Sequence, residues 1–359
     1  MAKKCYVGVN GVARKVVKGY VGVDGVARKI RKAYIGIGGV ARPCWSGGEL
    51  AYYGTITPLS VARYYLAATT VGDYALFGGG SLGDENCDTV DAYNSSLTHT
   101  IPTALDSNRT GLAATTVGNY ALFGGGYTVG ITGMVEAYSS SLTKRSVTSM
   151  NSGRIYIATA TVGNYALFGG GFNGSNGTTE VDAYSSSLTL TSATSLGVRK
   201  RNHAATTVGN YALFAGGTES TVYSYDESLT RTQLTSWSTK REQLSATTVG
   251  KYALFAGGVS STAIDVYDES LTHTTPITLS EARFSLAATT VGNYALFGGG
   301  RENKSTLDAY DESLTHTTST ALSFARGDLA ATTIGKYALF GGGSGNSTYY
   351  STVDAYTIA

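Results

Sequence analysis

The chain has 359 residues, of which 42% are hydrophobic and 14% charged, and this balance indicates a globular rather than a disordered protein. Its 47 glycines follow no three-residue period, which excludes collagen and leaves turns and strand ends as their places. We expect no membrane insertion and no secretion signal, because no stretch of 18 apolar residues occurs and the first residues lack an apolar core. Cys5, Cys44 and Cys87 do not suggest a disulfide framework, although Cys5 and Cys44 flank one region and could pair.

The first 48 residues contain a short repeat whose tyrosines, Tyr6, Tyr20 and Tyr34, are 14 residues apart. The dipeptides Asn10-Gly11, Asp24-Gly25 and Gly38-Gly39 lie between apolar segments, which is typical of two-residue hairpin turns. The segment has a net charge of +9, whereas the remainder has −7. We therefore predict a small basic domain over residues 1–48, made of three β-hairpins in a meander, with the rest of the chain (49–359) as a second domain.

The repeat in residues 1–48 resembles the N-terminal repeats of structural proteins from phages and prophages of gram-positive bacteria. The resemblance implies a virion protein that docks onto other virion proteins through residues 1–48, is made in the host cytoplasm and is released by lysis. A plain cytoplasmic protein fits the absence of a signal equally well. The lysines and arginines flank the hairpin turns at regular spacing, which favours a docking face over a nucleic-acid site.

From residue 50 onward the dominant feature is a longer repeat. The phrase VGDYALFGGG at 71–80 recurs six times, with tyrosines 41 to 46 residues apart, at Tyr74, Tyr120, Tyr165, Tyr211, Tyr252, Tyr294 and Tyr337. Each unit reads as four short strands, and this period is typical of propeller blades. The seventh unit stops after its third strand, Val353 to Tyr356, whereas Leu59 to Arg63 match Leu279 to Arg283, which end a fourth strand and start a first. Thr55 to Leu59 should therefore be the missing outer strand. We therefore predict an all-β, seven-bladed propeller closed by an N-terminal strand.

The repeat resembles the Kelch family in three features. These are a glycine doublet after an apolar strand (Gly78-Gly79 in the first copy), a basic residue before the inner strand, and a tyrosine in the third strand, at Tyr93, Tyr138, Tyr184, Tyr225, Tyr267, Tyr310 and Tyr356. Kelch repeats usually have a tryptophan seven positions after that tyrosine, where this chain has Thr100, Arg145, Thr191, Thr232, Thr274 or Thr317. We expect the packing between blades to differ accordingly.

Two sets of residues are candidates for a binding face. The first is the basic residue of each repeat, which could ring the channel mouth and hold an anion, or could make structural hydrogen bonds: Arg63, Arg109, Arg154, Lys200, Arg241, Arg283 and Arg326. The second comprises the aromatics of the loops after the glycines, which differ from copy to copy and could stack on sugars or reflect unconstrained drift: Tyr127, Phe172, Tyr349 and Tyr350.

The sequence offers little for catalysis. His99, His273 and His316 share one repeat position, which predicts exposed outer-strand residues too far apart to hold a metal. His203 has no cysteine or carboxylate at ligand spacing, and the aspartates of the third strands suggest a structural role. We therefore predict no catalytic residue, no cofactor and no metal site.

These observations lead to the hypothesis of a virion appendage whose propeller binds a bacterial surface glycan or protein with the avidity of repeated copies. One alternative is a capsid or tail decoration protein without receptor activity. The others are a Kelch-type sugar-modifying enzyme and an intracellular scaffold that binds acidic peptides. The chain could form a homo-oligomer, but no coiled-coil heptads in the sequence indicate one.

Overall fold

The computed structural model describes residues 48–358 with side chains and, before them, six strands by their backbone alone. By contacts the chain divides into two compact units, Met1–Ala51 with Ile358–Ala359, and Tyr52–Thr357. A domain boundary after residue 48 stays a prediction. All elements of the described residues are strands, so none of them is a helix able to cross a membrane.

The first unit contains three antiparallel hairpins. They pair β1 (Tyr6–Val9) with β2 (Val12–Lys15), β3 (Gly19–Val23) with β4 (Val26–Ile30), and β5 (Lys32–Ile37) with β6 (Val40–Ser46). Each hairpin forms its own two-stranded sheet within the described backbone, instead of the continuous meander that we expected. The turn dipeptides and the proposed pairing of Cys5 with Cys44 lie outside the described residues.

The second unit consists of seven four-stranded antiparallel sheets, the blades of the propeller. The first blade has β8 (Ala67–Val71), β9 (Tyr74–Gly78), β10 (Val90–Asn94) and β11 (His99–Thr100), and the second has β12 (Ala113–Val117), β13 (Tyr120–Gly124), β14 (Val135–Ser139) and β15 (Lys144–Val147). The third has β16 (Ala158–Val162), β17 (Tyr165–Gly169), β18 (Val181–Ser185) and β19 (Leu190–Ser192), and the fourth has β20 (His203–Val208), β21 (Tyr211–Gly216), β22 (Val222–Tyr225) and β23 (Arg231–Leu234).

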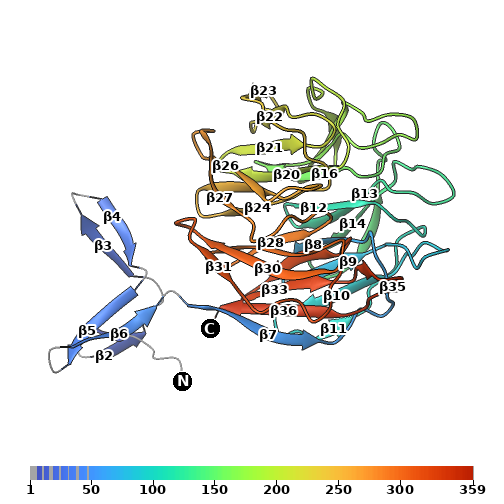
Figure 1. Ribbon diagram of the computed structural model, residues 1–359. Coiled ribbons are helices and arrows are strands. Elements are labelled where there is room, and N and C mark those ends of the chain that lie inside the picture. The colour runs from blue at the N-terminus through green and yellow to red at the C-terminus, as the bar shows by residue number, and fades with distance from the viewer. Residues whose placement is uncertain are drawn as a thin grey trace. The chain divides into compact units, whose positions relative to one another are not determined.

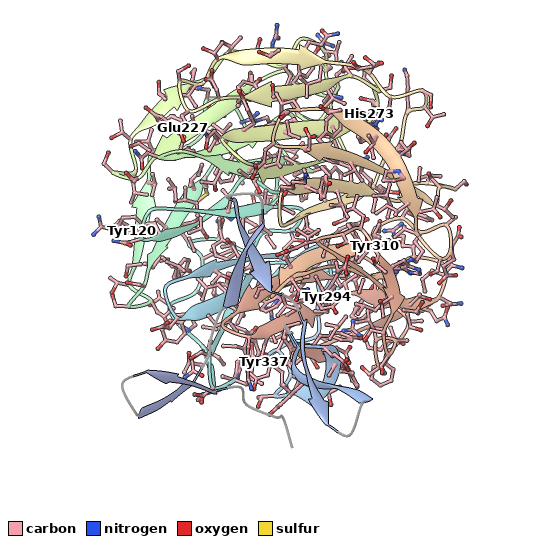
Figure 2. All side chains as sticks on the ribbon, turned by 90° about the vertical axis from the view of Figure 1, so that its left-hand side faces the viewer. Tyr120, Glu227, His273, Tyr294, Tyr310 and Tyr337 are labelled. Atoms are coloured by element: carbon pink, nitrogen blue, oxygen red, sulfur yellow. The ribbon has the colours of Figure 1, made fainter. Side chains whose placement is uncertain are left out.

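The remaining blades follow the same order. The fifth has β24 (Ser245–Val249), β25 (Tyr252–Ala256), β26 (Ala263–Asp268) and β27 (His273–Thr278), and the sixth has β28 (Ala287–Val291), β29 (Tyr294–Gly300), β30 (Lys304–Asp311) and β31 (His316–Thr318). The seventh has β32 (Ala330–Ile334), β33 (Tyr337–Gly341), β36 (Val353–Ile358) and β7 (Leu50–Ile56), with a small hairpin of β34 (Ser344–Gly345) and β35 (Thr348–Tyr349) inserted. Figure 2 labels Tyr120, Tyr294 and Tyr337, which begin the second strands of three separate blades.

The ring closes as the sequence predicts. The N-terminal strand β7 lies beside the C-terminal strand β36 as the outer strand of the seventh blade (Figure 1). It starts at Leu50 and ends at Ile56, so the strand lies a few residues before the predicted Thr55 to Leu59. The Tyr52 hydroxyl donates to Asp354 Oδ1 at 2.7 Å, which ties the two ends of the chain together. The seven-bladed, all-β prediction is confirmed.

A belt of threonines joins the inner strands around the axis. In every blade one threonine hydroxyl donates to the backbone carbonyl of the equivalent threonine in the preceding blade, in the order Thr70 to Thr333, Thr116 to Thr70, Thr161 to Thr116, Thr207 to Thr161, Thr248 to Thr207, Thr290 to Thr248 and Thr333 to Thr290. Small β-branched residues therefore occupy the strands nearest the axis because they fit and because their hydroxyls satisfy carbonyls there.

The glycines that follow each second strand explain the packing between blades. A Cβ at Gly78 would lie 2.7 Å from the ring of Phe123 in the next blade, so the missing side chain makes room for that ring. Gly79 has a φ of +65°, and a Cβ there would lie 2.7 Å from the carbonyl of Arg109. The Gly80 N–H donates to this carbonyl at 2.8 Å. Phenylalanine against a small residue, glycine in five blades and alanine in two, is thus a repeated contact between blades in this chain.

Candidate functional site

The seven basic residues do not ring an open channel mouth. All of them are buried, with at most 3% exposure, and they lie inside the blades. Six of the seven pair with a buried carboxylate on the third strand of the same blade: Arg63 with Asp91, Arg109 with Glu136, Arg154 with Asp182, Arg241 with Asp265, Arg283 with Asp308, and Arg326 with Asp354. Burial raises the pKa of Asp91, but the charge of Arg63 and the hydrogen bonds from Ser60, Arg63 and His99 together hold that pKa below its usual value. These arginines have a structural role and cannot meet a ligand from solvent.

The fourth blade departs from this pattern at both partners. Lys200 replaces the arginine, and Tyr223 stands where the other blades have the carboxylate. The Lys200 ammonium donates only to backbone carbonyls within the described residues, those of Gly216 at 2.8 Å and Glu219 at 3.1 Å. Burial without a carboxylate lowers the pKa of Lys200 to about 7.

The three outer-strand histidines are part of the same ion-pair system. The His99 Nε2 lies 2.7 Å from Asp91 Oδ1, and His273 and His316 make the equivalent contacts in the fifth and sixth blades. His273 lies at the periphery of the propeller (Figure 2). The histidines do lie in separate blades as predicted, and His316 is exposed, but His99 and His273 are partly buried and all three contact a buried aspartate.

The residues that face the axis come from a repeat position two residues after each arginine. Seven residues, here called the axial ring, have φ values between 51° and 63°, in the left-handed region: Tyr65, Gly111, Tyr156, Asn202, Gln243, Ser285 and Asp328. Backbone N–H groups in the ring donate to the preceding member at 2.8–3.2 Å, for example Gly111 to Tyr65 and Tyr65 to Asp328. A left-handed conformation costs a non-glycine residue about 1–3 kcal/mol, and such strain gathers at functional sites.

One side of the axial ring carries a hydrogen-bonded group of three side chains. Arg301 donates through Nε to Asp328 Oδ2 at 2.7 Å and through Nη2 to the hydroxyl oxygen of Tyr65 at 2.5 Å. Burial, and after it the charge of Asp328, raises the pKa of Tyr65 to about 12, so this phenol keeps its proton at neutral pH. Because the Tyr65 oxygen accepts the bond from Arg301, its own hydrogen remains available for a ligand.

Three pockets meet at this group. The central pocket, of about 180 Å³, is lined by Tyr65, Tyr156, Asn202, His203, Gln243, Leu244, Ser285 and Ile157. The Tyr127 pocket, of about 420 Å³, shares Tyr65 and Tyr156 with it, and is also lined by Tyr64, Asp84, Asn86 and Tyr127. The Tyr349 pocket, of about 510 Å³, shares Tyr64 with the Tyr127 pocket and includes Phe284, Arg301 and Tyr349.

The structure separates the four predicted loop aromatics. Tyr127 and Tyr349 line two of these pockets. Phe172 is covered by the Arg201 guanidinium, 5.1 Å from its ring centroid, and Tyr350 stacks on Phe324 at 5.2 Å. Thus only two of the four belong to the lining of the candidate site.

Sequence reasoning missed the axial ring, Arg301 and His203 as members of one site. A signal was present, because this position varies among Tyr, Gly, Asn, Gln, Ser and Asp, whereas the residue two positions before it is always basic and the residue after it is leucine or isoleucine in six of the seven copies. His203 likewise stands where the other blades have leucine or isoleucine, such as Leu66 or Ile157. Burial, followed by the charge of Lys200, lowers the pKa of His203 to about 3, so the imidazole is neutral.

No family model matches the chain, and no curated protein matches it either. Among solved structures, a fungal alcohol oxidase of the AA5 family, in complex with copper, is similar over 87% of this chain and 77% of its own, with 12% identity and a TM-score of 0.66. YjhT is similar over 84% of this chain and 95% of its own, with 10% identity and a TM-score of 0.54. At such identities the likeness shows the propeller fold alone.

The comparisons overturn two predictions. Neither neighbour is described as a phage or virion protein, and one of them is an enzyme, so the interpretation as a virion protein that binds a bacterial surface is contradicted. The prediction that the chain is not an enzyme is contradicted by the same finding. It rested on the missing sequence motifs, whereas the side chains of the axial ring come together only through the closure of seven blades.

The residues of this chain do not fit the copper of the fungal neighbour. Copper in proteins is held by imidazoles together with sulfur or, for Cu(II), oxygen ligands. Within the part of the chain that the structure describes, no three His, Cys, Asp or Glu residues come together as a metal site, and His203 is the one imidazole that lines the central pocket. We therefore assign no copper-dependent step to this protein.

Proposed function

We propose that the propeller is an enzyme that acts on a neutral, hydroxyl-rich small molecule of the sugar class in the central pocket. The observation that carries this proposal is the hydrogen-bonded group of Tyr65, Arg301 and Asp328 at the edge of the axial ring. It combines a protonated phenol with a guanidinium whose charge is balanced by a carboxylate. Such a group can bind and polarise an uncharged oxygen.

The side chains suit proton transfer at a hydroxyl or carbonyl group. Tyr65 donates a hydrogen bond, and then its proton, to the substrate oxygen, while Arg301 stabilises the phenolate that remains. Glu242 provides a carboxylate near the fourth and fifth blades, where its Oε2 accepts a bond from Asn202 of the axial ring at 3.0 Å. In our proposal Glu242 accepts the proton from a carbon beside the substrate carbonyl and returns it to the same or the neighbouring carbon, while Tyr65 recovers its own proton, so the reaction is an epimerisation or an isomerisation.

Two observations support the proposal. The fold is shared with an alcohol oxidase, whose substrates bear hydroxyl groups as sugars do. The central pocket also has the amide and hydroxyl side chains of Asn202, Gln243 and Ser285 opposite the tyrosines, and such groups match the hydroxyls of a sugar. A peptide scaffold that used the arginines has no support, because those side chains are buried.

The repeat architecture supports a Kelch-type assignment as part of this proposal. In each blade the last glycine of the GGG or AGG phrase donates its N–H to the carbonyl of the next blade's basic residue, from Gly80 to Arg109 through Gly343 to Arg63. The glycines and the basic residue of the repeat therefore act together at one junction between blades.

The test is turnover of sugars by the full chain in D₂O. Proton NMR would follow a panel of neutral aldoses, ketoses and N-acetylhexosamines for loss of a C–H signal and the appearance of an isomer. We expect Tyr65→Phe to slow the turnover about 10²-fold or more, because it removes a proton donor and keeps the ring. Arg301→Met should have a similar effect.

Tyr120→Phe is the matched control, because Tyr120 begins β13 in the second blade and lines none of the three pockets. It should leave turnover unchanged. Absence of both turnover and binding for every sugar, or full turnover by Tyr65→Phe, would overturn the proposed function.

A further inference from the structure

The Tyr127 pocket has features of a second sugar subsite that the proposed reaction does not need. It shares the wall formed by Tyr65 and Tyr156 with the central pocket, so the two spaces adjoin at the reacting group. The central pocket, at about 180 Å³, is smaller than the roughly 300–1,000 Å³ of typical ligand sites. A substrate larger than one small ring must therefore extend into a neighbouring space.

The tyrosines of this pocket retain open ring surface. Tyr127 is 43% exposed and Tyr156 is 38% exposed. Tyr349, which lines the neighbouring Tyr349 pocket, is also 38% exposed, but its ring stacks on Tyr64 with centroids 4.9 Å apart, and a Cβ at Gly83 would lie only 2.9 Å from it. Tyr349 therefore stiffens the wall, whereas Tyr127 and Tyr156 can stack on the apolar face of a sugar ring.

The polar groups around Tyr127 select against an anion. Asp84 is exposed on the pocket lining, and Glu85 follows it in the same loop. The Asn86 Nδ2 donates to the carbonyls of Tyr127 at 3.0 Å and Thr128 at 3.3 Å, so the loop of the first blade is fixed to that of the second. The remaining carboxylate and amide oxygens can accept hydrogen bonds from hydroxyl groups, but they repel a negatively charged ligand.

We propose that the substrate is a neutral oligosaccharide of at least two units, with one unit in the central pocket and the next held between Tyr127 and Tyr156. This inference rests on the proposed function and adds to it the length and the charge of the substrate. Tyr65 then serves both units, as the reacting group on one side of the shared wall and as part of the second subsite on the other.

The experiment compares sugars of increasing length on the full chain. Affinities of glucose, cellobiose and cellotriose, and of N-acetylglucosamine and its β-1,4-linked dimer and trimer, would be measured by calorimetry and saturation-transfer NMR, with digalacturonate as an anionic probe. We expect the dimer of at least one series to bind about tenfold more tightly than its monomer, which corresponds to ~1.4 kcal/mol. Digalacturonate should gain nothing over galacturonate.

Tyr127→Ala should abolish the gain from monomer to dimer. Phe172→Ala is the matched control, because Phe172 has the equivalent loop position in the third blade but is covered by Arg201 and lines none of the three pockets. It should retain the gain.

The outcomes separate this inference from the proposed function. Monomers that bind and react, together with dimers that bind no better, would overturn the inference and leave the enzyme intact. A gain that survives Tyr127→Ala, or a stronger gain for digalacturonate, would also overturn it. Failure of every sugar to bind or react would overturn the proposed function itself.

Discussion

Replacement of Lys200 by methionine should remove a specific pH dependence of stability. Lys200 is fully buried and donates to two backbone carbonyls, and its blade has Tyr223 where the others have a carboxylate. Burial lowers the pKa of this ammonium from 10.5 to about 7. Between pH 7 and 10.5 the unfolded chain therefore holds a proton that the folded chain has released. Because the unfolded state binds more protons, this residue makes stability rise with pH through that window.

The size of the effect follows from the two pKa values. Between pH 7 and pH 9, the wild type should gain about 2 kcal/mol of unfolding free energy relative to Lys200→Met. Other groups that titrate in this range are common to both proteins and cancel in the difference. In Lys200→Met two carbonyls lose their hydrogen-bond donor. This changes the difference in unfolding free energy between the two proteins by a constant amount, and it does not change how that difference varies with pH.

Urea unfolding at pH 7, 8 and 9 would measure the difference, with the buried Trp237 as the fluorescent reporter. Lys200→Arg is the matched control, because an arginine keeps its charge throughout this range. It should lose the pH dependence as methionine does, yet be less stable than the wild type at pH 9, where Lys200 is neutral. A constant difference between the wild type and Lys200→Met from pH 7 to 9 would refute the reasoning.

Three further predictions concern the glycines at the blade junctions, the threonine belt and His203. Gly79→Ala should lower stability by about 2 kcal/mol or more, because its φ is positive and a carbonyl would lie 2.7 Å from the new Cβ. Gly78→Ala should cost less, since two other blades have alanine at that position. Thermal unfolding of both variants would contradict this reasoning if Gly78→Ala were the less stable of the two. Thr161→Val should cost about 1 kcal/mol in urea unfolding, because the Thr116 carbonyl loses its hydroxyl donor, and an unchanged midpoint would contradict the threonine belt. On acidification from pH 6.5 to pH 4, the wild type should lose about 3 kcal/mol more of its unfolding free energy than His203→Leu. The folded pKa of His203 is about 3 and the unfolded value is 6.5, so only the unfolded imidazole takes up a proton in this range. Urea midpoints that fall equally for wild type and variant on acidification would exclude this effect.

The sequence predicts the architecture well, because the architecture depends on the positions that recur in every copy of the repeat. Seven copies of one phrase, with a missing fourth strand at one end and a matching strand at the other, are sufficient to predict the ring and its closure. The strand bounds were less certain, since β7 begins at Leu50, in a stretch with no counterpart in the repeat. Its pairing depends on Asp354 and Tyr356, which are some 300 residues later in the chain.

The sequence around each arginine does not show whether its side chain lies at the channel mouth or is buried inside the blade. A basic residue before an inner strand fits a channel mouth as well as a buried pair, and only the folded blade shows that the third-strand carboxylate lies against it. The sequence nevertheless contains a test of this pairing. The one copy with lysine in place of arginine, at Lys200, is also the one copy with Tyr223 in place of a carboxylate, which is what a direct contact between the two positions requires.

The same comparison among copies points to the site. Positions that hold the blades together, such as the threonines of the belt and the glycines at the junctions, hardly change from copy to copy. The axial ring has an equally demanding backbone, since all seven members adopt positive φ, yet its side chains differ in almost every blade. Backbone geometry alone would favour glycine, asparagine or aspartate at each of these positions. Tyr65 and Tyr156 therefore depart from the locally favoured residues where they meet Arg301 or the central pocket, and this is the strongest reason to look for chemistry there.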